Sequence, residues 1–223
     1  MSQLGQVSIG HKAPDFHCEA VVGGAIKGTY SSWLSKSTQS IAYTCSEVSL
    51  STFIRPSASP DSPDPDRPWL LLLFIPAAFS FVCPTEVIAF QNCYDEFKDR
   101  NCNIAFVSVN TKHSLWHWQN IPHQYGGLGN IDIPLLSDAT HKIGQDYGVL
   151  IEEEGISLRG MFIIDNDGLV QQVSMHMDTC YSLRTRYIQW LIICSDYAQQ
   201  PHCRTKCSGS PSPPQGVPGC CKA

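Results

Sequence analysis

The chain has 223 residues, a formal net charge of −5, 43% hydrophobic residues and 16% charged residues. This length fits one large domain or a smaller domain with appendages. The apolar fraction is sufficient for a buried core, which excludes a wholly disordered chain. The mild acidity argues against a nucleic-acid-binding surface, which needs clustered Lys and Arg. The longest apolar run, Trp69 to Ile75, is too short to cross a bilayer.

Eleven cysteines are a high number for a chain of this length. Residues 1–10 contain no apolar signal segment, so we expect a reducing, cytoplasmic compartment in which a structural disulfide framework is disfavoured. The count alone does not distinguish redox chemistry, metal binding and an incidental tail. The last thirty residues hold five of the cysteines, which are Cys194, Cys203, Cys207, Cys220 and Cys221.

The first part of the chain has few regular signals. Residues 1–30 are a mixed, Gly-containing lead-in, and residues 31–68 contain eleven Ser and five Pro. Repeated proline removes backbone donors and prevents regular ladders. We therefore expect 31–68 to be a long, disordered, solvated loop that interrupts the domain, although such a loop is rare inside a compact domain.

From Trp69 onward the pattern alternates between strands and helices. The apolar run from Trp69 to Ile75 predicts a buried strand that Pro76 ends. Residues 86–98 predict a helix with Pro84 in its first turn, where proline is tolerated. The same criteria predict strands at 103–109, 133–136 and 160–164, helices at 115–123 and 139–147, and a hairpin that turns at 166–168 into 169–174.

This order predicts an α/β domain with a mixed central sheet flanked by helices. We place one domain over 5–175, a divergent helical segment over 176–200 with a helix at 182–198, and a disordered Cys- and Pro-rich tail over 201–223.

The segment that carries the chemical evidence lies between the first predicted strand and its helix. Cys83 stands in the first turn of that helix, where free backbone N–H groups and the helix dipole stabilise an anion. A thiolate is the nucleophilic form of cysteine. Ser80 supplies a hydroxyl three residues earlier, and Arg159 precedes another buried strand. The alternative on spacing alone is a small buried hydrophobe without chemistry.

Three residues of this segment, Pro76, Ser80 and Cys83, match the Pro-x-x-x-Thr/Ser-x-x-Cys pattern of peroxiredoxins. The run Phe-Val-Cys-Pro-Thr-Glu at 81–86 resembles the typical two-cysteine subgroup. Ala-Pro-Asp-Phe at 13–16 resembles the opening of the family, and the resemblance covers about 5–27 and 69–175. Further similar runs stand at 126–129, 133–138, 146–150 and 158–165.

The resemblance implies a thioredoxin-like fold and the reduction of hydrogen peroxide or organic hydroperoxides without a metal or organic cofactor. It implies that Cys83 attacks the peroxide and becomes a sulfenic acid, while Pro76 shields the thiolate. Ser80 would bind peroxide oxygens, Arg159 would polarise the pair, and Glu86 would orient the arginine. Thioredoxin or another thiol would be the reductant. The family's dimer is a further expectation.

The sequence also departs from the family pattern. Ile75 stands where tyrosine is usual, and Ala78 where aspartate is usual. Past residue 175 the match ends: the second active-site arginine and the resolving Val-Cys-Pro motif have no clear counterpart, and only Arg184 and Arg186 are near. Cys203, 120 residues after Cys83, is a candidate resolving cysteine. We hypothesise that 28–69 and the join at 175–176 reflect inserted or out-of-frame coding.

Other interpretations stay open. The tail could offer a zinc set of His202, Cys203, Cys207, Cys220 and Cys221, but it lacks paired C-x₂-C spacing. A second histidine group, His113, His117 and His123, fits a surface helix better than a metal site. Two function classes remain: a thiol peroxidase, and a catalytically impaired variant that acts as a chaperone-like or interaction protein.

Overall fold

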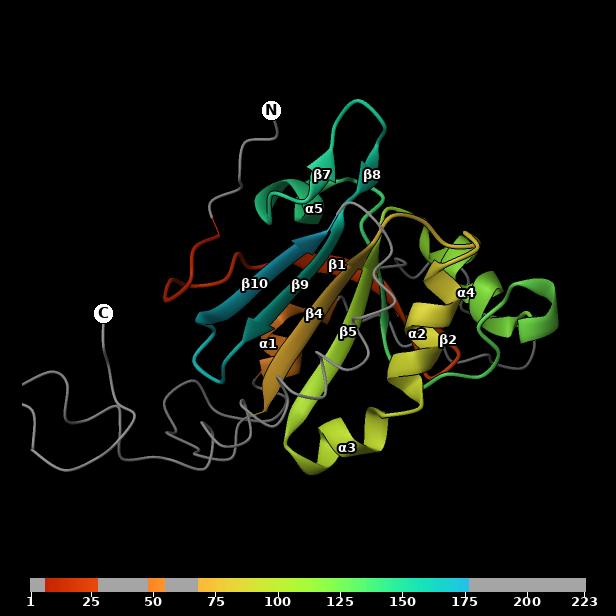
Figure 1. Cartoon of the computed structure of the whole chain (residues 1–223), viewed down its shortest axis with the longest axis horizontal. Helices are drawn as coiled ribbons and strands as arrows, with labels where there is room; N and C mark the ends of the chain where they lie inside the picture. The colour runs from red at the N-terminus through yellow and green to blue at the C-terminus, as the bar shows by residue number, and fades with distance from the viewer. Residues whose placement is uncertain (1–6, 28–47, 55–67, 177–223) are drawn as a thin grey trace, which may run out of the picture. The chain divides into compact units, whose positions relative to one another are not determined.

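A computed structural model of the chain describes residues 7–27, 48–54 and 68–176 (Figure 1). Every described residue lies in the first of the two units into which the chain divides, Met1–Tyr181. None of the helices in the described ranges is long and apolar enough to span a membrane.

A mixed β-sheet forms the centre of this unit, and β4 (Trp69–Ile75) lies in its middle. On one side β4 pairs in parallel with β5 (Cys102–Ser108), and on the other it pairs antiparallel with β9 (Arg159–Ile164). The sheet order is β10-β9-β4-β5-β6-β1-β2, with β3 paired to β1. The remaining strands of the sheet are β1 (His17–Val22), β2 (Ala25–Lys27), β3 (Val48–Ser49), β6 (Leu135–Ser137) and β10 (Val170–His176).

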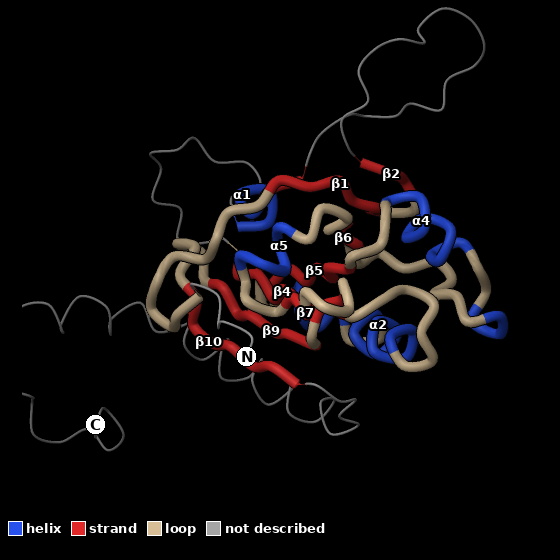
Figure 2. The backbone as a smooth tube through the Cα atoms, turned by 90° about the horizontal axis from the view of Figure 1, so that it is seen from above, coloured by secondary structure: helices blue, strands red, loops and turns tan. Residues whose placement is uncertain are grey.

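The helices cover both faces of the sheet. One face carries α1 (Leu50–Ile54) and α5 (Lys142–Asp146), whereas α2 (Cys83–Gln91) lies on the opposite side, as Figure 2 shows. Because both faces are covered, residues 70–75 of β4 are all buried, which explains the unbroken apolar run in the sequence. The other elements are α3 (Tyr94–Asp99), α4 (Lys112–Asn120), a 3₁₀ turn (His123–Tyr125) and a small hairpin of β7 (Leu150–Ile151) and β8 (Ile156–Ser157).

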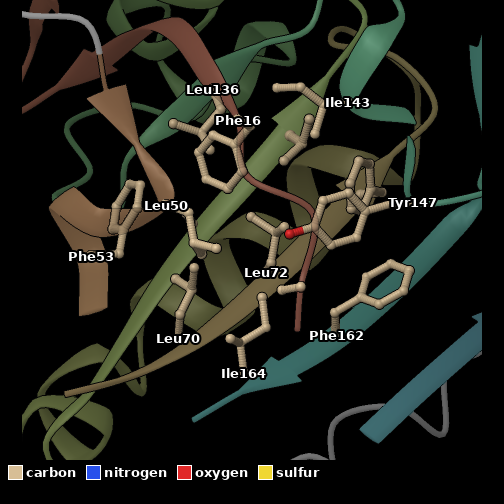
Figure 3. Packing of buried hydrophobic residues seen from close by; sticks show 14 of the residues in the cluster. Phe16, Leu50, Phe53, Leu70, Leu72, Leu136, Ile143, Tyr147, Phe162 and Ile164 are labelled. Atoms are coloured by element: carbon tan, nitrogen blue, oxygen red, sulfur yellow. The ribbon is translucent and has the colours of Figure 1, made fainter. Parts of the chain in front are cut away.

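An aromatic cluster lies at the centre of the core on the α5 side. The rings of Phe74, Tyr147 and Phe162 have centroids 4.9–5.6 Å apart, at tilted or edge-on angles, which are favourable geometries for aromatic pairs. Figure 3 shows Tyr147 beside Phe162 among buried aliphatic side chains. The buried Tyr147 hydroxyl donates to the Pro14 carbonyl at 2.9 Å. Burial raises the pKa of Tyr147, so this hydroxyl stays protonated and remains a donor.

The strands predicted after residue 68 form near the predicted positions, and the first of them has the predicted limits. The predicted helix over 86–98 is divided into α2, which already begins at Cys83 and ends at Gln91, and α3, which begins at Tyr94 after the N-cap residue Cys93. The predicted hairpin forms between β9 and β10. The lead-in also contains a hairpin, β1–β2, which turns through Gly23 and Gly24 at φ 56° and 76°; positive φ at both turn residues favours glycine.

The prediction of a continuous disordered loop over 31–68 is wrong at residues 48–54. Val48 pairs with Cys18 of β1, and α1 buries Leu50, Phe53 and Ile54 in the core. The i, i+3, i+4 spacing of these three residues is a helical signal that the surrounding serines and prolines obscured. Residues 31–47 and 55–67 lie outside the described residues, as do the tail predicted over 201–223 and all of the segment predicted over 176–200 except His176, which ends β10.

Candidate active site

Cys83 is the first residue of α2, directly after the loop that leaves β4. Its side chain is fully buried, and its backbone N–H donates to the Ser80 hydroxyl oxygen at 3.1 Å. Pro84 occupies the first turn of the helix, where a residue without an N–H leaves no hydrogen bond unmade. The local sequence therefore starts a helix at Cys83 and places this residue at the helix N-terminus, where the positive end of the helix dipole favours an anion.

Arg159, the first residue of β9, contacts both Cys83 and Glu86. Its Nη2 lies 3.9 Å from the Cys83 Sγ, and its Nε donates to the two Glu86 carboxylate oxygens at 3.2 and 3.4 Å. The side chains of Arg159 and Glu86 are only 14% and 18% exposed. Their ion pair is therefore shielded from solvent and fixes the direction of the guanidinium.

The environment of Glu86 contains two opposing influences. Burial raises the pKa of Glu86, and the charge and hydrogen bond of Arg159 lower that pKa by less, so the net direction is upward. The carboxylate thus depends on Arg159 for its stability as an anion inside the protein. In return it holds the guanidinium beside the sulfur, where a positive charge and N–H donors favour a thiolate and any negative charge that develops on a bound oxygen.

The loop between Ile75 and Cys83 is attached to the neighbouring segments by two side-chain hydrogen bonds. The buried Ser157 hydroxyl donates to the Ile75 carbonyl at 2.9 Å, and the Ala78 N–H donates to the Asn110 Oδ1 at 2.7 Å. Pro76 lies between these two anchors and is half-buried. Ile75, which replaces the usual tyrosine of the family pattern, is buried and brings no hydroxyl to the site.

The structure brings most of the predicted site residues together. Ser80, Cys83, Glu86 and Arg159 form one continuous set of contacts, and Pro76 belongs to the loop that carries two of them. Cys203, Arg184 and Arg186 lie outside the described residues. Within the described part of the chain no three His, Cys, Asp or Glu side chains are grouped in a way that could hold a metal ion, and His113, His117 and His123 are among the residues searched.

Sequence reasoning missed Asn110 and Ser157. A signal for Asn110 existed, because it follows β5 by two residues and β5 is parallel to β4. The carboxyl ends of parallel strands share one edge of a sheet, so the polar residues after β5 were bound to lie near the loop after β4. Ser157 had no such signal, since its position depends on how the β7–β8 hairpin folds back.

Comparison with known proteins supports the same family as the motifs. The AhpC/TSA family model matches residues 61–173. Peroxiredoxin TSA1 of Saccharomyces cerevisiae is 49% identical over 108 residues, which cover 48% of this chain and 55% of the yeast protein. Peroxiredoxin-2 of Bos taurus is 38% identical over 176 residues, which cover 79% of this chain and 73% of the bovine protein. The chain thus spans about half the length of the yeast relative.

Solved structures agree with the fold. The reduced 2-Cys peroxiredoxin of Plasmodium vivax superimposes with a TM-score of 0.66 at 31% identity, over 86% of this chain and 82% of the other. This similarity and the mixed sheet with flanking helices confirm the predicted thioredoxin-like α/β fold. The family match and the relatives confirm the resemblance drawn from the motifs. The chain belongs to the AhpC/TSA family and, within it, to the peroxiredoxins.

Proposed function

We propose that the chain is a thiol-dependent peroxidase that reduces hydrogen peroxide and organic hydroperoxides at Cys83. The observation that carries the proposal is the position of the Cys83 sulfur, at a helix start and 3.9 Å from a guanidinium that Glu86 holds in place. A buried thiol with only apolar neighbours would be inert. Here the guanidinium and the helix start favour both the thiolate that attacks the peroxide and the hydroxide or alkoxide that leaves.

The reaction begins when the Cys83 thiolate attacks one oxygen of the peroxide. A sulfur–oxygen bond forms, the oxygen–oxygen bond breaks, and the second oxygen leaves as hydroxide or alkoxide, which a proton converts to water or an alcohol. Cys83 is oxidised to a sulfenic acid and the peroxide is reduced. Arg159 stabilises the charge on the oxygens during this exchange. We assign the binding of the peroxide oxygens to the Ser80 hydroxyl and the Cys83 N–H, which are hydrogen-bonded to each other in the structure. Pro76 limits the access of water to the thiolate.

The sulfenic acid must then be reduced by a thiol. We assign this step to thioredoxin or another thiol reductant, with Cys203 as the candidate resolving cysteine. We also propose that the protein is a homodimer and that it acts in a reducing compartment such as the cytoplasm. A relative from Echinococcus granulosus, 37% identical over 168 residues, is called a thioredoxin peroxidase. Resolution requires a second thiolate that attacks the sulfenic sulfur and releases water.

The test compares the wild type with Cys83→Ser in two assays. The first follows peroxide consumption coupled to thioredoxin, and the second follows a single oxidation of the reduced protein without any reductant. We expect Cys83→Ser to lose activity in both. Cys93→Ser is the matched control, because Cys93 is half-buried on the turn after α2, and it should behave as the wild type. Equal peroxide consumption by the wild type and Cys83→Ser would refute the proposal.

A further inference from the structure

The loop before Cys83 contains an unfavourable backbone conformation. Phe79 has φ 62°, in the left-handed region, where a bulky side chain costs free energy and normally requires support from its surroundings. Phe79 is 47% exposed, and its ring lies 6.1 Å from the ring of Trp118, which is fully buried. Its ring also lies 6.3 Å from the His117 ring, so two side chains of α4 lie against this turn.

The stronger support comes from the residue before it. The Ala78 N–H donates to the Asn110 Oδ1 at 2.7 Å, and the same oxygen accepts the Ser108 hydroxyl at 2.8 Å. Two donors on one amide oxygen fix which end of the Asn110 side chain faces the loop. The Asn110 carbonyl also accepts the Ser137 hydroxyl at 2.9 Å. Asn110 is therefore held by residues of β5 and β6 and transmits their position to the loop.

The loop conformation in turn decides where Ser80 lies. Phe79 follows Ala78 and precedes Ser80, so its left-handed turn directs the chain back toward the helix start. In this arrangement of the loop the Ser80 oxygen accepts the Cys83 N–H at 3.1 Å. Release of Ala78 would let Phe79 relax to an ordinary backbone conformation and would move Ser80 away from Cys83.

We propose that Asn110 is a positioning residue for the reaction of Cys83 with peroxide, acting through the Ala78 N–H and the strained Phe79 turn to hold the Ser80 hydroxyl at the Cys83 backbone N–H. This inference rests on the proposed peroxidase function. Asn110 lies outside the contacts of Cys83 and Arg159, so its effect is one of geometry. Misplacement of a reacting group by about 1 Å can cost up to about 100-fold in rate.

The experiment uses the full chain and three variants. Asn110→Ala removes the acceptor, Asn110→Asp retains an oxygen that accepts both donors, and Asn120→Ala is the matched control. Asn120 lies at the other end of α4 and donates to the Trp116 carbonyl, away from the loop. The readouts are the rate of a single oxidation of Cys83 by hydrogen peroxide, the urea midpoint of unfolding, and hydrogen exchange at the Ala78 amide.

We expect Asn110→Ala to oxidise about 10- to 100-fold more slowly and its Ala78 amide to exchange faster. Asn110→Asp should restore both readouts, and Asn120→Ala should match the wild type. An Asn110→Ala protein with a lower urea midpoint but an unchanged rate would reduce Asn110 to a structural residue and overturn the proposal. So would an Asn110→Asp protein as slow as Asn110→Ala.

If Asn110→Ala fails to fold, Asn110→Ser takes its place. Independently of any variant, a wild-type Ala78 amide that exchanges as fast as an unprotected amide would overturn the proposal. Failure of the proposed function looks different, because the wild type would then react no faster than Cys83→Ser. A reactive wild type with an equally reactive Asn110→Ala refutes only the role of Asn110.

Discussion

The two ends of one short stretch of chain, Phe74 and Cys83, are held in place by different forces. Phe74 packs edge-on and tilted against Phe162 and Tyr147, in contacts that are individually weak and collectively large. Cys83 owes its surroundings to single directional bonds, among them the Arg159 contact. The core therefore distributes its stability over many atoms, whereas the site depends on a few.

This difference separates the two properties that a substitution can affect. Removing part of a fully buried ring leaves a cavity and lowers the free energy of unfolding, but it leaves the site's charges where they are. Removing one donor or charge at the site disturbs the reaction and leaves most of the apolar burial intact. We expect stability and peroxide reactivity to respond to different residues, even where these residues are neighbours in the sequence.

The largest effect expected is in the core. Phe162 is fully buried in the middle of β9 and contacts Phe74 and Tyr147, so Phe162→Ala should lower the free energy of unfolding by about 3–5 kcal/mol. Urea unfolding followed by circular dichroism measures this. Phe81→Ala is the matched control, because Phe81 is fully exposed at 102% and its loss should leave the urea midpoint unchanged. Equal loss of stability in both variants would contradict the division between core and site.

The next effect is at the site itself. Arg159→Gln removes the guanidinium beside Cys83 and should slow the oxidation of Cys83 by about 100-fold, the usual cost of losing a donor that stabilises developing charge. This corresponds to about 2.7 kcal/mol in activation free energy. Stopped-flow oxidation by hydrogen peroxide measures the rate.

Its control is Arg100→Gln, which removes the same charge at the end of α3, where Arg100 donates to the Glu96 carbonyl. The control should oxidise at the wild-type rate. A comparable slowing in both variants would mean that net charge, and not the Arg159 contact, governs the reaction.

The smallest effect is a change in the pH dependence of stability. Burial raises the pKa of Glu86 above its ordinary value of 4.5, so the folded protein binds this proton more tightly than the unfolded chain does. Stability contributed by the protonated form is therefore lost as the pH rises above 4.5. Glu86→Gln should remove this part of the slope in urea midpoints measured between mildly acidic and neutral pH.

Glu153→Gln, at an exposed position in the turn between β7 and β8, is the control for the loss of one carboxylate and should keep the wild-type slope. Burial also raises the pKa of Asp138, which adds to the same slope in every variant, so only the difference between Glu86→Gln and the wild type reports on Glu86. An unchanged slope in Glu86→Gln would contradict the burial of this carboxyl group.

Sequence patterns were most informative where the environment of a segment is uniform. The run from Trp69 to Ile75 is buried on both faces, and its limits as a strand could be predicted to the residue. The position of Cys83 in the first turn of a helix could also be predicted, because Pro84 and the apolar spacing after it are local signals, although the helix begins three residues before the predicted limit of 86. In contrast, α1 was missed, since its five residues become a stable helix only when Leu50, Phe53 and Ile54 pack against the sheet.

The candidate site shows the same division. Cys83, Ser80 and Pro76 belong to one local motif, so the sequence alone places a cysteine near the start of a helix that follows a buried strand. Arg159 lies 76 residues from Cys83, and the distance between them follows from the antiparallel pairing of β4 with β9. Asn110, two residues after β5, and Ser157 of β8 contact the segment before Cys83, at Ala78 and Ile75 respectively. These contacts could be read from the folded structure alone, because a directional bond between distant residues depends on strand register and chain direction, which hydrophobic patterns leave open.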